Sequence, residues 1–148
     1  MSLCEPVMRD EALGVCMLKQ LLAAQPADRL LALQCRIMAA QYPQTMEAIA
    51  ASALTNYTER DLVHFAHGAG FNQVHMALHI DLKPSAQTNW TTFLESAPHP
   101  LAPTVSAILA SQFTAGERAY FEEHFRPVIE SGSSVVTSRN AYLTAGKA

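Results

Sequence analysis

Cysteine, charge and long apolar runs are all scarce in this sequence. Its three cysteines, Cys4, Cys16 and Cys35, form no C-x-x-C pair and, being odd in number, no closed disulfide framework, so we expect reduced thiols in a cytoplasmic protein. Ten lysines and arginines against 13 aspartates and glutamates leave no cationic surplus, which argues against nucleic acid or an anionic membrane as a partner. No apolar run approaches the ~20 residues needed to cross a bilayer, and we expect no secretory signal.

Motifs that would identify a nucleotide-binding or hydrolytic enzyme are also missing. The sequence has no G-x-G-x-x-G, no Walker loop, no G-x-S-x-G and no H-E-x-x-H. Gly68-Ala69-Gly70 is similar to the start of a dinucleotide-binding loop, but it follows a predicted helix and precedes a predicted strand, the reverse of a phosphate-binding turn. We therefore predict that these glycines end a helix.

The six histidines do not form a metal-binding pattern. His75 and His79 are four residues apart on a predicted strand, hence roughly 13 Å apart, too far for one ion with bonds of ~2.0–2.1 Å. His64 and His67 share a helical face, but no local cysteine or carboxylate pattern completes a ligand set. We expect no metal site. A single histidine as general base stays open, since imidazole titrates near neutral pH, and the sequence does not identify which one.

The sequence does contain enough apolar material for a globular core. Hydrophobic residues make up 49% of its 148 positions, and this length predicts a single domain, 1–148. Apolar residues recur at helical spacing along most of the chain, but with a period of two from 72 to 81 and again from 135 to 145. This alternation of helices and strands predicts an α+β fold.

Capping residues suggest where the helices begin. Asp10 is the predicted N-cap of a first helix, and Pro26 is expected in the first turn of a second. Thr-x-x-Asp at 58–61 and Thr-x-x-Glu at 114–117 have the form of capping boxes, so a helix is predicted to start at each.

Two groups of residues could belong to a binding site. Five aromatic side chains gather in the helical segment between the two predicted strands, where they either pack an ordinary core or form a lid over an apolar pocket. Glu5, Arg9 and Asp10 near the N-terminus are either a solvated helix entrance or the polar rim of a site. The aromatic residues are Trp90, Phe93, Tyr120, Phe121 and Phe125.

Three segments together resemble the C-terminal half of a class I S-adenosylmethionine-dependent methyltransferase. Residues 2–6, Ser-Leu-Cys-Glu-Pro, are similar to the fifth strand of that family and its Glu-Pro pair. Residues 67–74, His-Gly-Ala-Gly-Phe-Asn-Gln-Val, look like the passage from a helix into the sixth strand. Residues 141–147, Ala-Tyr-Leu-Thr-Ala-Gly-Lys, are similar to the closing seventh strand.

The resemblance implies a fold and a set of substrate-side residues. We expect a small mixed sheet of about three strands flanked by helices, built from a helical block 10–56, a helix–strand unit 58–82, a helical lid 88–131 and a C-terminal strand 134–146. The resemblance assigns Glu5, Arg9, Trp90 and Phe93 to the substrate side. It yields no ligand of S-adenosylmethionine, because the cofactor-binding motifs of the family belong to its N-terminal half.

The resemblance also implies an activity and partners. Full-length relatives would transfer a methyl group from S-adenosylmethionine to a small or lipophilic acceptor, whereas this chain, as a truncated half, is expected to bind no cofactor and to be inactive alone. The fifth strand would have an open edge, so we expect a homodimer or a separate N-terminal half to cover it. The alternative is a non-catalytic, self-associating α+β module that binds an apolar ligand or a protein partner.

Overall fold

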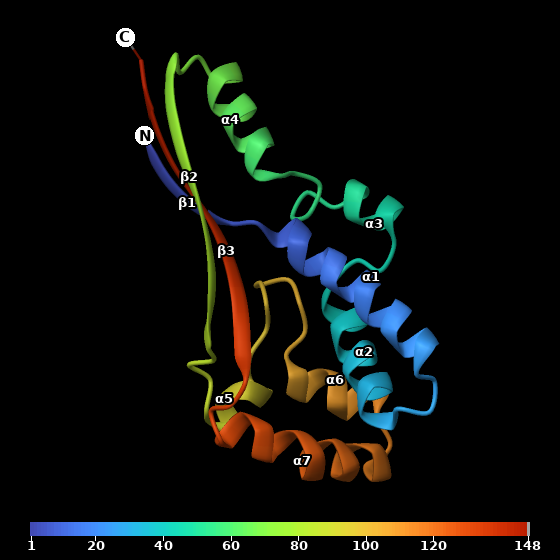
Figure 1. Ribbon diagram of the computed structural model, residues 1–148. Coiled ribbons are helices and arrows are strands. Elements are labelled where there is room, and N and C mark those ends of the chain that lie inside the picture. The colour runs from blue at the N-terminus through green and yellow to red at the C-terminus, as the bar shows by residue number, and fades with distance from the viewer. Residues whose placement is uncertain (148) are drawn as a thin grey trace.

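A computed structural model describes residues 1–147 and confirms the α+β class over that range. Helices lie along one side of a long, twisted sheet, so that the other face of the sheet is open (Figure 1). The elements are β1 (Ser2–Pro6), α1 (Met8–Ala24), α2 (Arg29–Gln41), α3 (Met46–Ala51), α4 (Glu59–Gly68), β2 (Gln73–Pro84), α5 (Trp90–Leu94), α6 (Val105–Gln112), α7 (Ala115–Glu130) and β3 (Val135–Gly146).

The sheet has the order β1-β3-β2 over the described residues, with β3 antiparallel to both neighbours. Ala141 of β3 lies opposite Glu5 of β1 and opposite Leu78 of β2. The sheet is therefore antiparallel, and the prediction of a mixed sheet was wrong in this respect. β1 and β2 do run in the same direction, but the last strand lies between them, so no parallel pair forms in residues 1–147.

The hydrophobic core of the described residues falls into two clusters. The sheet cluster packs α4 against β3 and β2, and the helical cluster joins α2 to α5, α6 and α7. The buried members of the sheet cluster are Val7, Leu62, Ala66, Ala141, Leu143 and Ala145. Those of the helical cluster are Leu33, Ile37, Trp90, Val105, Ile108, Leu109, Phe113, Phe121 and Ile129.

Helix α4 covers only the first part of β2. The predicted alternation is confirmed there, because Val74 and Met76 pack into the sheet cluster while His75 is exposed. Further along the same side of the strand, Ile80 is 57% and Leu82 75% exposed, although both are large and apolar. The sheet thus has a covered half under α4 and a half whose apolar side chains face solvent.

Both predicted capping boxes are present. The Thr58 hydroxyl accepts from the Asp61 backbone N–H, and the Asp61 carboxylate accepts from the Thr58 backbone N–H at 2.7 Å. The same reciprocal pair joins Thr114 and Glu117 at the start of α7. Gly70 has a φ of +84°, which confirms the helix end predicted for that glycine.

The starts of the first two helices differ from the prediction. Helix α1 begins at Met8, so Asp10 lies inside its first turn, and its carboxylate accepts from Arg139 Nη1 of β3 at 2.7 Å instead of capping the helix. Helix α2 begins at Arg29 with Asp28 as N-cap, which leaves Pro26 in the preceding turn. No helix within residues 1–147 is long and apolar enough to cross a membrane.

Candidate functional site

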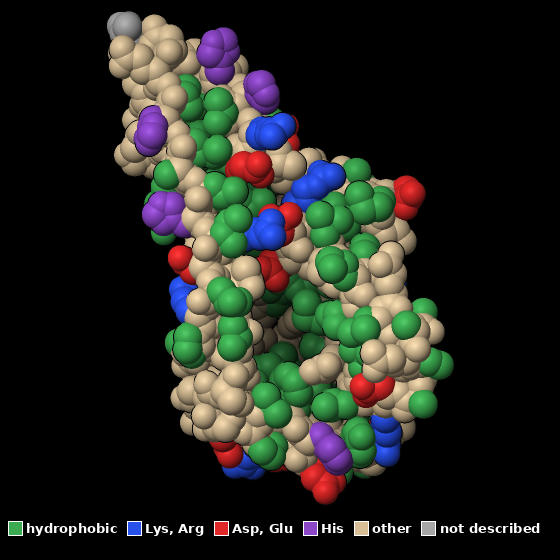
Figure 2. Space-filling model, in the orientation of Figure 1, with side chains coloured by type: hydrophobic (Ala, Val, Ile, Leu, Met, Phe, Trp, Pro, Cys, Tyr) green, Lys and Arg blue, Asp and Glu red, His purple; other side chains and the backbone are tan. Residues whose placement is uncertain are grey.

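A cavity of about 570 Å³ lies between the helical layer and the beginning of β3. In the space-filling view a hollow opens at this level of the molecule, with hydrophobic side chains around it (Figure 2). Its apolar lining comes from six elements and one loop: Leu18 of α1, Ile37 and Met38 of α2, Phe93 of α5, Ala97 and Pro98 after α5, Val105 of α6, Phe121 and Phe125 of α7, and Val136 of β3.

Aromatic rings form one wall of the cavity. The ring centroids of Phe121 and Phe125 are 4.9 Å apart, and those of Phe93 and Phe125 are 5.5 Å apart. Phe121 is only 1% exposed and anchors this wall in the helical cluster. These separations are typical of favourable aromatic pairs, so the wall offers an apolar aromatic surface to a ligand.

The polar lining is neutral except for one carboxylate. It consists of Glu11, Gln34, Gln41, Tyr42, Gln87 and Ser96. Gln41 donates its side-chain N–H to the carbonyl of Pro103 at 3.0 Å, and Gln87 donates to the carbonyl of Thr92 at 3.4 Å. No lysine or arginine is among the described residues that line the cavity.

The charge of Glu11 acts on Tyr42 across this lining. Burial raises the pKa of Glu11 above its usual value, the charge of Asp10 raises it further, and Arg139 opposes both effects. Burial, and then the charge of Glu11, raises the pKa of Tyr42 to about 12. Tyr42 is therefore a protonated hydroxyl at neutral pH, able to donate a hydrogen bond.

His99 lies beside Gln41 and Tyr42 of this polar lining. Its Nε2 is 3.3 Å from the carbonyl oxygen of Gln41, and its ring meets that of Tyr42 edge-on with centroids 6.3 Å apart. Its Nδ1 is buried and has no partner among the described residues. An imidazole that donates from Nε2 would keep Nδ1 as an acceptor.

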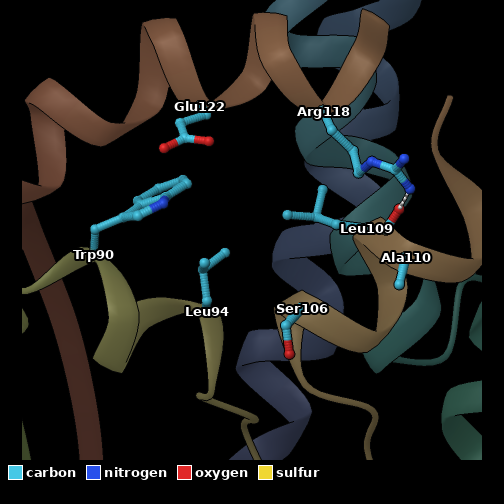
Figure 3. Close-up of a pocket in the computed structure, with 7 residues that line it drawn as sticks. All are labelled: Trp90, Leu94, Ser106, Leu109, Ala110, Arg118 and Glu122. Atoms are coloured by element: carbon cyan, nitrogen blue, oxygen red, sulfur yellow. Dashed lines mark hydrogen bonds between the residues drawn. The ribbon is translucent and has the colours of Figure 1, made fainter. Parts of the chain in front are cut away.

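Phe93 and Trp90, two of the residues expected on the substrate side, lie together. Their rings stack with centroids 5.3 Å apart, but they face different spaces. Phe93 lines the cavity, whereas Trp90 lines a second pocket of about 320 Å³ between α5, α6 and α7. Figure 3 shows this pocket, in which Glu122 of α7 lies over Trp90 and Arg118 donates to the carbonyl of Leu109.

Glu5 and Arg9, the other two, do not line the cavity. The Glu5 carboxylate accepts a hydrogen bond of 2.6 Å from the Tyr57 hydroxyl; burial, and then this bond, raise the pKa of Tyr57 to about 12. The pKa of Asp61 is lowered chiefly by its hydrogen bonds from Thr58, and the positive charge of Arg9 adds to this. Both residues thus connect the N-terminal segment with the region of α4.

Residues of α1 and α2 complete the cavity, and the sequence reasoning did not include them. Gln34, Ile37, Met38 and Gln41 follow the spacing i, i+3, i+4, i+7, so all four lie on one face of α2. The sequence signal that could have identified this wall is the presence of two glutamines, Gln34 and Gln41, on an otherwise apolar face of α2.

Comparison with protein-family models, curated proteins and solved structures gave no match. Within residues 1–147, no group of three or more histidine, cysteine, aspartate or glutamate side chains is placed to hold a metal ion. The cavity is therefore the feature of the described chain from which a function can be argued.

Proposed function

We propose that this chain binds a small lipophilic molecule in the cavity and is the acceptor-binding part of a methyltransferase-like protein. The observation that supports this proposal is the cavity itself. Its volume of about 570 Å³ is within the ~300–1,000 Å³ typical of small-molecule sites. Its lining also has the usual composition of such sites, mostly apolar and aromatic with a few polar groups that can orient a ligand.

The arrangement of the strands supports the methyltransferase-like part of the proposal. The three segments that carry the resemblance form β1, the α4–β2 unit and β3, and they all belong to one sheet. The helical segment that the resemblance assigns to a lid, 88–131, contributes Phe93, Phe121 and Phe125 to the cavity. β1 has a single neighbour among the described strands, so its other edge is free to accept a further strand.

S-adenosylmethionine itself does not fit this cavity. The carboxylate of the cofactor would find no lysine or arginine among the described lining residues. No glycine-rich turn lines the cavity in the described chain either. We therefore propose acceptor binding only, with the cofactor on a separate N-terminal half, and derive no methyl-transfer step for these residues.

A neutral fluorescent probe, N-phenyl-1-naphthylamine, tests this proposal. The wild-type chain should bind it, and Ala97→Trp, which fills the cavity at the loop after α5, should weaken binding by about tenfold or more. Ala53→Trp, at an exposed alanine outside the cavity, is the matched control and should leave binding unchanged. Equal binding by both variants, or none by the wild type, would refute the proposal. Micromolar binding of S-adenosylmethionine by calorimetry would refute the division of roles.

Self-association is a second candidate function, favoured by the exposed half of β2. Leu78, Ile80 and Leu82 present apolar side chains on a strand that has one neighbour among the described strands. Such an edge is a template for pairing with another chain. Light scattering at micromolar concentration should show a dimer that Ile80→Lys dissociates, and a monomeric wild type would exclude this function.

A further inference from the structure

We infer that the cavity selects aromatic ligands carrying an O–H or N–H donor and rejects anionic ones, with Glu11 as the group that accepts the donor. This inference rests on the proposed function, because it names the class of ligand that the same cavity binds. Three observations support it. The carboxylate of Glu11 has no partner in the described chain, no lysine or arginine lines the cavity there, and the aromatic wall lies in the same cavity.

Glu11 keeps its carboxylate free for a ligand. The cation whose charge acts on Glu11 is Arg139, and its Nη1 is bound to Asp10 at 2.7 Å. No hydrogen bond or ion pair joins Glu11 itself to any residue in the range 1–147. Glu11 is an exposed residue that lines the cavity, so a donor on the ligand can take the place of a water molecule at its carboxylate.

Other cations of the neighbouring helices are engaged elsewhere. Lys19 donates to the Gln44 side chain at 2.6 Å. Arg36 pairs with Glu117 at 2.6 Å, and the Arg29 guanidinium lies 4.1 Å from the centre of the Tyr120 ring. A carboxylate or phosphate on the ligand would therefore meet the charge of Glu11 with no cation on the described lining to offset it.

The remaining polar groups suit a hydroxyl. Tyr42 is held as a protonated phenol and can donate to the ligand oxygen, while Glu11 can only accept. Gln41 and Gln87 each have one side-chain N–H bound to a backbone carbonyl, and each also has an oxygen that can accept. An aromatic hydroxyl or amine meets these requirements, with its ring against Phe93 and Phe125.

Three naphthalene probes of similar size test the inference by calorimetry. 2-Naphthol has a donor, 2-methoxynaphthalene lacks one, and 2-naphthoate is an anion. The wild type should bind 2-naphthol about tenfold more tightly than either of the others. Glu11→Gln should bring 2-naphthoate within about threefold of 2-naphthol, because the repelling charge is gone. Glu123→Gln, the same change at an exposed glutamate of α7, is the control and should preserve the wild-type ranking.

The outcomes separate the inference from the proposed function. If all three probes bind the wild type equally, or if Glu11→Gln keeps the wild-type ranking, the inference is refuted while cavity binding stands. If no probe binds, or if Ala97→Trp does not weaken them, cavity binding is refuted and the inference falls with it.

Discussion

Phe121 belongs both to the helical cluster and to the wall of the cavity. Truncating its side chain therefore tests how much this aromatic wall contributes to the stability of the fold. It is 1% exposed, and its ring lies 4.9 Å from that of Phe125 and 6.2 Å from that of Trp90, centroid to centroid. Removing about 150 Å² of buried aromatic surface costs about 4 kcal/mol at ~25 cal/mol per Å². The adjoining cavity prevents the neighbours from closing the space, so Phe121→Ala should lower the free energy of unfolding by about 3–5 kcal/mol.

Urea denaturation followed by circular dichroism measures this loss. Phe65→Ala is the matched control, because Phe65 is 60% exposed on α4 and its truncation should change the free energy of unfolding by no more than about 0.5 kcal/mol. A loss below about 1.5 kcal/mol for Phe121→Ala, or equal losses for the two variants, would show that the aromatic wall does not anchor the helical cluster.

Two further predictions concern a helix cap and the cavity carboxylate. Thr114→Ala removes the N-cap of α7 and should cost about 1 kcal/mol of stability in the same assay; a change near zero would contradict the capping box. Because burial raises the pKa of Glu11 in the folded chain, its contribution to stability is fully present at low pH and is lost as pH rises through the folded value. Glu11→Gln should therefore gain stability relative to the wild type as the pH rises from 4 to 7, and a constant difference over that range would contradict the raised pKa of Glu11.

Local features of the fold could be predicted from the sequence. The capping boxes at Thr58 and Thr114 depend on residues three positions apart, and the end of α4 depends on Gly70 alone. The alternation along β2 requires only that one face be apolar. In each case the interactions that decide the structure lie within one or two turns of the chain, so the local sequence is sufficient.

The features of the structure that could not be predicted from the sequence depend on contacts between residues far apart in the chain. Asp10 has the chemistry of an N-cap, but its partner is Arg139 on the last strand, and nothing near Asp10 signals that ion pair. The pairing of β3 with both other strands made the sheet antiparallel for the same reason. In the cavity, Phe93 was anticipated as one of five clustered aromatic residues. Glu11 and Tyr42 are site residues only because the packing of α1 on α2 brings them to the same cavity.

The central position of β3 has a consequence for how the chain folds. Thr144 lies opposite both Ser2 and His75, so both ladders of the sheet require β3 to be synthesised. Until then β1 and β2 have no strand between them, while the individual helices, whose backbone hydrogen bonds are local, can already form. We therefore expect the helical layer to form during synthesis and the sheet to close in a slower, final step, during which the apolar side chains of β2 are exposed to other chains.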